Sequence, residues 1–414
     1  MENTFFINNR NKITEKMPNH SAMVLFSGES PIMGGDRLYD FYVNRNFYYT
    51  AGIDRENMIF TAVKTGDDVL FTLYIPRFNG QTARWVGANM TADEAKSASG
   101  IADIRFIDEF DGGVADMVCR HNVTEIYIDT DNRFNRTELT KGLAFADRIR
   151  RGYPHLNILS ANGILTDLRE IKSDREIDAI KKGIEITKEG IYAMMKNARP
   201  SMAEYELEAY FDFTLKKYGV KHPAFNTIAA GGKNAAVLHY EDNNSVVNDG
   251  EMILFDLGAA WDNYSADITR TFPINGKFTE VQKNFYNMVL KGQQMVIDMI
   301  KPGLPFGDMN KALREYYLEE MKKRGFADTD EELSKYYFHS VSHHLGLETH
   351  DVGTRTGELK AGMVITVEPG IYIEELGIGI RIEDDVLVTE NGCEVLSKDI
   401  IKTVEDIEKF MAEG

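Results

Sequence analysis

Cysteine is scarce in this sequence. Its 414 residues include only Cys119 and Cys393, which stand far apart and form no CxxC pair. A disulfide framework needs several cysteines and a thiolate metal site needs closely spaced ones, so neither is indicated. So low a content is typical of proteins that work in a reducing compartment. We therefore expect the protein to be cytoplasmic.

Long apolar segments are missing as well. A transmembrane helix needs about 20 consecutive apolar residues, and no part of the chain approaches that length. The first residues, MENTFFINNRNKITEKM, lack an apolar core of the length that a signal peptide needs. The sequence thus predicts neither a membrane segment nor export.

Basic residues are outnumbered by acidic ones. The chain has 47 lysines and arginines against 65 aspartates and glutamates, which gives a formal net charge of -18. Such a charge repels a phosphate backbone and an anionic membrane surface alike. We therefore expect neither nucleic acid nor a membrane as a partner.

The composition that remains is ordinary for a globular protein, with 43% hydrophobic and 27% charged residues. A length of 414 residues suggests two domains. In the first part of the chain, short apolar runs alternate with polar segments that suit helices, a pattern typical of α/β structure. These runs are MVLF (23–26), NMIFTAV (57–63), VLFTLYI (69–75) and EIYID (125–129).

The pattern changes near residue 165. Ser173 followed by Glu176 forms a capping box, after which isoleucines recur on one helical face at positions 177, 180, 184 and 191. Beyond about residue 220, strands and glycine turns prevail, interrupted by a helical region from Glu280 to Gly325. We therefore expect an N-terminal α/β domain at 1–165 and an α+β domain at 166–414.

Histidine is concentrated in one segment, HSVSHHLGLETHDVG (339–353). Of the nine histidines, four fall within twelve consecutive positions: His339, His343, His344 and His350. Imidazole serves as a metal ligand and as a proton carrier, so this segment is a candidate site.

Two aspartates of the second domain are candidates to accompany these histidines. Asp256 lies inside the apolar run Met252–Leu257, where an ionised carboxylate is costly unless it is paired or binds a metal. Asp267 follows eleven residues later, and the intervening WDN is typical of a turn between two strands. A hairpin would bring both carboxylates together, with a bulge if they are to share a face. Their repulsion would raise one pKa unless a cation lay between them. Alternatively, Asp256 accepts backbone hydrogen bonds and Asp267 caps a turn.

Two glutamates repeat this pattern downstream. Glu368 ends a β-branched apolar run directly before a Pro-Gly turn, in MVITVEPG. In GIRIEDD the residues alternate, so that Arg381 and Glu383 share one face of a strand and two isoleucines share the other. Taken alone, such a charged face is typical of a solvated edge with an ion pair.

The whole set of Asp, Asp, His, Glu and Glu in one domain favours a metal site instead. Four carboxylates carry a charge of about minus four, which two divalent cations would neutralise, and oxygen-rich ligation with one imidazole suits Mn²⁺ and tolerates Co²⁺, Zn²⁺ or Fe²⁺. The set therefore indicates a dinuclear site.

The order and spacing of these motifs resemble the metal-dependent pita-bread peptidases and, within them, the aminopeptidase P family. The family pattern is DxG with a second Asp in DxTR, then SHxLGxxxHDVG, then EPG, then RxED. Here FDLGAAWDNYSADITRTF, SHHLGLETHDVG, VEPGIYI and GIRIEDD stand in that order. The resemblance implies an α+β chain with a pita-bread catalytic domain at 166–414, after a creatinase- or aminopeptidase P-like N-terminal domain. It implies five metal ligands: Asp256, Asp267, His343, Glu368 and Glu383.

The same resemblance implies roles for further residues. Glu368 would also carry protons as the catalytic acid and base, and His350 would contact the substrate carbonyl and stabilise the oxyanion. His239 would be a further catalytic histidine that hydrogen-bonds near the scissile peptide or its proline, and His339 would lie beside the substrate pocket. His344 would pack or hydrogen-bond rather than bind metal.

Three more residues are candidates for substrate binding. Arg381 would anchor a substrate carboxylate, or would pair with Asp384 or Asp385 and anchor its own strand. The N-terminal part is a weaker match to the family, and there Asp36 and Trp85 would reach a neighbouring subunit's active site in a homodimer or homotetramer. A loop aspartate and a packing tryptophan are the alternatives.

The implied activity is hydrolysis of the bond between an N-terminal residue and a following proline, by a hydroxide held by two metal ions. The expected partner is thus a peptide with proline at its second position. Xaa-Pro dipeptidases (prolidases) are the alternative, although Ser342 before His343 favours the aminopeptidase. Pita-bread proteins that serve only as binding modules have lost metal ligands, and this chain keeps all five.

Overall fold

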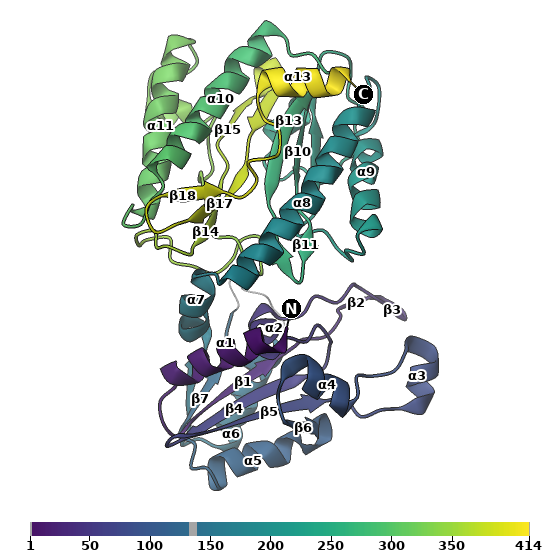
Figure 1. Cartoon of the computed structure of the whole chain (residues 1–414), viewed down its shortest axis with the longest axis vertical. Coiled ribbons are helices and arrows are strands. Elements are labelled where there is room, and N and C mark those ends of the chain that lie inside the picture. The colour runs from purple at the N-terminus through teal and green to yellow at the C-terminus, as the bar shows by residue number, and fades with distance from the viewer. Residues whose placement is uncertain (1, 132–138, 414) are drawn as a thin grey trace. The chain divides into compact units, whose positions relative to one another are not determined.

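A computed structural model describes residues 2–131 and 139–413 of the chain. It divides into two compact units, Met1–Leu168 and Arg169–Gly414, which are drawn in Figure 1. The division falls within one helix, α7 (Asn162–Glu170), and the boundary that the sequence suggests, after residue 165, lies in the same helix.

The first unit contains a six-stranded mixed sheet in the order β6-β5-β4-β1-β7-β8. The pairs β1–β4 and β4–β5 are antiparallel, whereas β5–β6, β1–β7 and β7–β8 are parallel. Its strands are β1 (Ser21–Phe26), β4 (Ile59–Thr65), β5 (Asp68–Ile75), β6 (Asp103–Phe106), β7 (Glu125–Ile128) and β8 (Asn157–Ser160). The four apolar runs predicted from the sequence lie on β1, β4, β5 and β7, so the α/β pattern is confirmed.

Helices and a small hairpin complete the first unit. The helices are α1 (Asn3–Lys16), α2 (Arg45–Ala51), α3 (Gly80–Val86), α4 (Ala92–Ser99), α5 (Phe110–Cys119), α6 (Lys141–Gly152) and most of α7, and the hairpin is formed by β2 (Ile32–Gly34) and β3 (Arg37–Leu38). Val24, Ile126 and Ile128 of the sheet pack with Phe110 of α5 and Phe145 of α6 in one buried core. Burial of such side chains is the main force that holds the helices to the sheet.

The second unit places short antiparallel sheets between helices. In Figure 1, α8 and α9 lie on one side of these strands, and α10 and α11 lie on the other. The sheets are β13-β10-β9, β14-β17-β18, β15-β16 and β11-β12, and every strand pair described in this unit is antiparallel. The expected α+β arrangement is therefore confirmed.

The strands and helices of the second unit have the following bounds. The strands are β9 (Ile228–Gly231), β10 (Met252–Leu257), β11 (Ala260–Trp261), β12 (Tyr264–Ser265), β13 (Ile268–Pro273), β14 (Val364–Val367), β15 (Gly370–Ile373), β16 (Ile378–Arg381), β17 (Asp384–Val388) and β18 (Cys393–Val395). The helices are α8 (Asp174–Asn197), α9 (Glu204–Lys217), α10 (Glu280–Met299), α11 (Phe306–Lys323), α12 (Asp330–Leu333) and α13 (Val404–Ala412). Two short 3₁₀ turns, Gly232–Ala236 and Glu374–Leu376, connect some of them.

Helix α8 begins where the sequence predicts. Ser173 is its N-cap, and both the backbone N–H and the hydroxyl of Ser173 donate to Glu176 Oε2 at 2.8 Å. This capping box satisfies donors that the first turn of a helix leaves unpaired. Ile180, Ile184 and Ile191 are buried along one face. The predicted cap and the predicted apolar face are both confirmed.

The helical region predicted from Glu280 to Gly325 consists of two helices. Helix α10 ends at Met299 and α11 begins at Phe306. Pro302 and Pro305 lie in the break, and proline lacks the backbone N–H that a continuous helix requires. Helix α11 packs against α10, and α10 also contacts β14, β15 and β16.

Among the residues 2–131 and 139–413, no helix combines the length and the apolar character needed to cross a membrane.

Candidate metal centre

The two candidate aspartates meet on neighbouring strands. β10 pairs with β13 so that Asp256 lies opposite Thr269 and Leu257 opposite Ile268, without a shift of register. Asp267 precedes β13 and stands two residues from Thr269, so the alternation of side chains puts Asp256, Thr269 and Asp267 on one face. The predicted hairpin is confirmed, and it needs no bulge in the β10–β13 pair.

The connection between the aspartates is a second, smaller hairpin. β11 and β12 are joined by a turn at Asp262 and Asn263, whose φ angles of 49° and 66° are typical of a tight hairpin turn. The predicted WDN turn is therefore confirmed. At the base of this hairpin a Cβ on Gly258 would lie 1.8 Å from the carbonyl oxygen of Ala266, so only glycine allows the two chains to approach this closely.

The histidine segment lies alongside β14. The backbone N–H of Leu345 donates to Val364 O at 3.0 Å, that of Thr366 to His343 O at 2.9 Å, and that of Glu368 to Val341 O at 2.9 Å. These three bonds fix the backbone of His343 relative to that of Glu368. The sequence-distant histidine and glutamate are thus held side by side by main-chain pairing.

The ring of His343 is oriented by its own neighbour. Its Nδ1 lies 3.0 Å from His344 O, which can only accept a hydrogen bond, so Nδ1 carries the proton and Nε2 carries a lone pair. That lone pair faces Asp267 Oδ2 at 3.3 Å and Glu368 Oε1 at 3.5 Å. Burial, helped by His350, lowers the pKa of His343 to about 3, so the ring is neutral near pH 7. An imidazole nitrogen and two carboxylate oxygens that converge in this way are an arrangement that suits a metal ion.

Repulsion between the carboxylates also favours a metal ion at this position. Burial and the charges of neighbouring carboxylates raise the pKa of Asp267 and of Glu383 well above the usual range. Burial, opposed by Arg381 and assisted by Asp256, raises the pKa of Glu368 to about 8. A cation among these groups would favour their ionised forms.

Three of the expected ligands form a compact group. Each of Asp267, His343 and Glu383 offers a ligand atom, and these atoms lie within 4.8 Å of one another. Glu368 joins them through His343, as described above. Asp256 stands at the edge of the group, and its Oδ1 is buried without a hydrogen-bond partner. A buried, unpaired carboxylate oxygen is costly, and a metal ion would satisfy it.

Arg381 is buried and bonded at all three nitrogens. Its NH2 group donates to Asp256 Oδ2 at 2.6 Å, its NH1 group to the Tyr372 hydroxyl at 2.9 Å, and its Nε to Thr269 Oγ1 at 3.1 Å. Thr269 Oγ1 in turn donates to Glu383 Oε2 at 2.6 Å. The prediction that Arg381 pairs with Asp384 or Asp385 to anchor its own strand is wrong. Its partner is Asp256 of β10, which lies opposite Thr269 of β13, and Arg381 donates to both residues.

The solvated face that the sequence allows for Arg381 and Glu383 is also wrong. The two residues are 2% and 1% exposed. An edge strand would leave them in water, but here the segment lies inside the unit, between β13 and α10.

The remaining histidines of the segment lie around this group. The ring of His350 is exposed, and its centroid lies 4.4 Å from that of His343. Tyr372 Oη lies 2.9 Å from His339 Nε2, while His339 Nδ1 lies 2.8 Å from Ser340 O and therefore carries its proton. The Tyr372 hydroxyl accordingly accepts from Arg381 and donates to His339. Burial, then Arg381, lowers the pKa of His339 to about 3.

His239 is exposed, in the segment that follows the 3₁₀ turn Gly232–Ala236. Its segment is anchored by Glu204, which is fully buried at the start of α9. The carboxylate of Glu204 accepts four hydrogen bonds, from Gly231 N at 2.7 Å, Ser245 N at 2.8 Å, Asn234 Nδ2 at 3.0 Å and Tyr240 Oη at 3.0 Å. Glu204 thus fixes both ends of the segment that carries His239.

The comparisons with known proteins agree with this site. Residues 178–390 match the model of metallopeptidase family M24, and residues 6–127 match that of the aminopeptidase P N-terminal domain. The chain belongs to metallopeptidase family M24.

Known members of the family resemble the chain over its full length. It is 30% identical to a Xaa-Pro aminopeptidase of Haemophilus influenzae, over 98% of this chain and 96% of the relative. A solved structure from Bacillus anthracis, provisionally assigned as an aminopeptidase P, is 48% identical with a TM-score of 0.97 and covers 100% of this chain and 99% of that one. The aminopeptidase P of Escherichia coli, solved with the inhibitor Pro-Leu, is 27% identical with a TM-score of 0.91, at 100% and 99% coverage. The resemblance noted from the motifs is confirmed.

Two predicted residues of this M24 chain belong to the first unit. Asp36 is exposed in the turn between β2 and β3, and Trp85 is 84% exposed on α3. They are not part of the cluster in the second unit, and their action at a neighbouring subunit's site stays a prediction.

His343 and His344, the two adjacent histidines of the M24 motif, lie in different environments. His344 is buried, its ring stacks on Phe306 at a centroid distance of 5.3 Å, and its Nε2 lies 3.3 Å from Thr354 O. This is the packing and hydrogen bonding expected for it. His343 alone of the pair faces the carboxylates.

Several site residues were missed by the sequence reasoning. Thr269 and Tyr372 link Arg381 to Glu383 and to His339, and Asp385 accepts a hydrogen bond from the backbone N–H of Asp267 at 3.2 Å. Strand alternation could have found Thr269, which shares a face with Asp267. Nothing local marks Tyr372 or Asp385, because their partners come from other strands.

Proposed function

We propose that the chain is a Xaa-Pro aminopeptidase, which hydrolyses the bond between the N-terminal residue of a peptide and a following proline. The observation that carries this proposal is the neutral His343, whose Nε2 lone pair faces Asp267 and Glu368 in a member of the M24 family. The full-length similarity of the chain to a relative named as a Xaa-Pro aminopeptidase supports the substrate class.

The metal ligands in this proposal are those of the motif set: Asp256, Asp267, His343, Glu368 and Glu383. Four carboxylates with one imidazole suit two divalent cations, with Mn²⁺ first and Co²⁺, Zn²⁺ or Fe²⁺ as substitutes. The unpaired Oδ1 of Asp256 and the raised carboxyl pKa values support a positive charge among them. When bound, the two ions supply a hydroxide near neutral pH and polarise the scissile carbonyl.

The chain's own groups then handle the protons and the substrate. Glu368 accepts the proton of the attacking water on a carboxylate oxygen and delivers it to the departing prolyl nitrogen. His350 donates a hydrogen bond to the oxyanion. His239 and His339 line the side on which the substrate binds. Proline's fixed ring and missing N–H explain why a dedicated peptidase is needed for this bond.

The contacts of Arg381 support an aminopeptidase over a prolidase. A dipeptidase must bind the free carboxylate of proline with a cation, whereas an aminopeptidase must leave that direction open. Arg381 is the cation that the motif offers, and it is buried against Asp256. We therefore assign Arg381 to the orientation of Asp256 rather than to the substrate. A non-catalytic binding module would not need five metal ligands.

The remaining assignments follow the same family. We propose that 1–165 is the N-terminal domain and 166–414 the catalytic domain, that the enzyme is cytoplasmic in keeping with its few cysteines, and that it forms a homodimer or homotetramer. In that assembly Asp36 and Trp85 reach the active site of a neighbouring subunit. Its partners are peptides with proline at the second position, and neither nucleic acid nor membranes.

Peptide cleavage tests the proposal directly. Purified protein loaded with Mn²⁺ should release the first residue from Xaa-Pro-Xaa peptides and cleave Xaa-Pro dipeptides much more slowly, with product identity read by mass spectrometry. A peptide with alanine in place of proline is the matched control. Efficient cleavage of dipeptides with longer peptides left intact would replace the proposal with a prolidase.

A further inference from the structure

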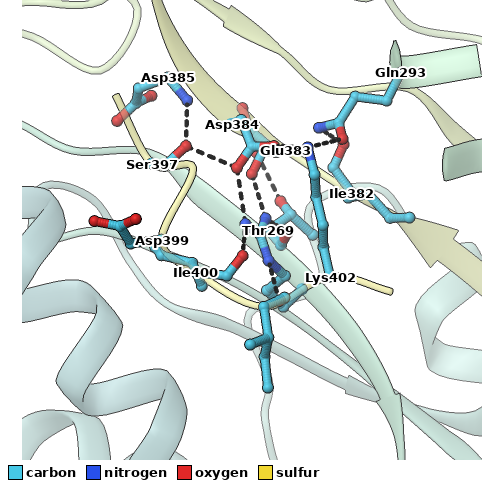
Figure 2. A network of polar contacts seen from close by, with 12 residues as sticks. Thr269, Gln293, Ile382, Glu383, Asp384, Asp385, Ser397, Asp399, Ile400 and Lys402 are labelled. Carbon is cyan, nitrogen blue, oxygen red and sulfur yellow. Dashed lines mark hydrogen bonds and ion pairs between the residues drawn. The ribbon is translucent and has the colours of Figure 1, made fainter. Parts of the chain in front are cut away.

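Gln293 of α10 is a buried side chain with two backbone acceptors. It is fully buried, and its Nε2 amide donates to Val367 O at 3.1 Å and to Ile382 O at 3.0 Å. Figure 2 shows the Gln293 amide beside Ile382. One side chain thus joins the end of β14 to the segment between β16 and β17.

The two acceptors stand directly before proposed metal ligands. Val367 precedes Glu368, and Ile382 precedes Glu383. The carbonyls of Val367 and Ile382 belong to the peptide bonds that join these residues to Glu368 and Glu383. By bonding to both carbonyls, Gln293 sets the distance between the backbones of the two glutamates. The Nε2 group has two hydrogens and uses one for each carbonyl.

The orientation of this amide is itself fixed. Lys402 Nζ donates to Gln293 Oε1 at 2.8 Å and to Asp384 Oδ2 at 2.6 Å. Because an ammonium group can only donate, the atom of Gln293 that faces Lys402 is the oxygen, and the nitrogen must face the two carbonyls. Lys402 comes from the C-terminal segment, far from α10 in the sequence.

Asp384 links Lys402 to Arg270 and Ser397 through its carboxylate. Arg270 NH2 donates to Asp384 Oδ1 at 2.8 Å, and the Ser397 hydroxyl donates to the same oxygen at 2.7 Å. Arg270 NH1 also donates to Glu383 O at 2.6 Å and to Thr269 O at 2.9 Å. Figure 2 shows the Ser397 hydroxyl beside Asp384, next to Glu383. The backbone of Glu383 is therefore held on both sides, by Gln293 before it and by Arg270 at its own carbonyl.

We propose that Gln293 is a positioning residue that sets the spacing of Glu368 and Glu383 and thereby the affinity of the site for divalent metal ions. This inference rests on the proposed function, because it takes both glutamates as ligands. Gln293 acts through backbone carbonyls and does not touch metal or substrate. Residues that orient ligands from behind typically contribute about 10- to 100-fold to metal affinity.

Two substitutions separate the amide from the bulk of the side chain. Gln293→Glu keeps the shape and the oxygen that faces Lys402 but removes both N–H donors, and Gln293→Met keeps the volume and removes all polar groups. Gln282→Met is the matched control. Gln282 lies on the same helix, is buried, and donates its amide to Gly250 O at 2.8 Å, away from the ligands.

The measurement is titration of metal-free protein with Mn²⁺ by calorimetry, together with the visible absorption spectrum of the Co²⁺-loaded protein. We expect both Gln293 variants to bind about 10- to 100-fold more weakly than wild type and to show an altered cobalt spectrum. Gln282→Met should match wild type in both readouts, whatever its stability.

Three outcomes decide the inference. Wild-type affinity and an unchanged cobalt spectrum in both Gln293 variants would overturn it, and so would equal losses in the Gln293 and Gln282 variants, which would reflect general destabilisation. If the Gln293 variants do not fold, Lys402→Met takes their place: it frees the amide to rotate, and unchanged metal affinity in that variant would overturn the inference. Failure of wild type itself to bind Mn²⁺ would instead overturn the proposed function.

Discussion

Metal-free protein should lose stability as the pH rises from 6.5 to 8. Burial, opposed by Arg381 and assisted by Asp256, raises the pKa of Glu368 from 4.5 to about 8 in the fold. In this window the unfolded chain has already released that proton, whereas the folded chain still holds it. Folding therefore binds a proton, and raising the pH favours unfolding.

The magnitude follows from the linkage relation. Each pH unit costs about 1.4 kcal/mol per retained proton, so about 1.5 units remove about 2 kcal/mol through Glu368 alone. Asp267 and Glu383, whose pKa values are also raised, act in the same direction. His339 and His343 act weakly in the opposite direction at the low end of this window, because their pKa values are lowered to about 3 in the fold whereas an unfolded imidazole is still partly protonated near pH 6.5.

Urea unfolding of chelator-treated protein at the two pH values measures this loss. The chain has two tryptophans, so a Trp85→Phe background leaves Trp261 on β11 as a fluorescence reporter in the unit that holds the site. Two controls sharpen the result. Glu368→Gln should reduce the pH dependence, leaving the part that comes from Asp267 and Glu383, and Mn²⁺ should abolish it because a bound cation keeps the carboxylates ionised. Metal-free protein that is as stable at pH 8 as at pH 6.5 would refute the reasoning.

Four further substitutions test separate parts of the site. His343→Ala should lose metal and most activity while His344→Ala keeps its metal, as elemental analysis will show; the reverse would shift the motif by one residue. Arg381→Met should destabilise the metal-free protein by about 3–5 kcal/mol in urea unfolding, because it leaves a buried carboxylate without its partner; a change below 1 kcal/mol would contradict the contacts described. Glu204→Ala should raise KM without changing metal content, because it releases the segment that carries His239; loss of metal with unchanged KM would contradict that role.

The sequence predicted the elements whose signals are local. The run Met252–Leu257 is strand β10 because its apolar residues are continuous and a turn follows, and Ser173 with Glu176 starts α8 because a capping box needs only neighbouring residues. The motif order also predicted which aspartates, glutamates and histidine belong together, and Asp267, His343 and Glu383 do form one group in the structure. Family motifs record the result of folding, so they locate a site without any knowledge of strand order.

The sequence could not predict interactions set by pairing between distant strands. One of the two roles predicted for Arg381 was a pair with Asp384 or Asp385, its sequence neighbours, but it pairs with Asp256, and Asp384 instead binds Arg270 and Lys402. Burial reversed the expectation of a solvated edge at Glu383 for the same reason. Gln293 carried no signal at all, because a glutamine on an amphipathic helix is ordinary until the carbonyls that it meets are known.

The most direct test of the central claim is the position of metal in the protein. Crystals of Mn²⁺-loaded protein, with diffraction recorded on both sides of the manganese absorption edge, should give two anomalous peaks among Asp256, Asp267, His343, Glu368 and Glu383. The peaks should vanish after chelation together with peptidase activity. Manganese bound elsewhere, or full activity in crystals and solution without any metal at these five residues, would contradict the account.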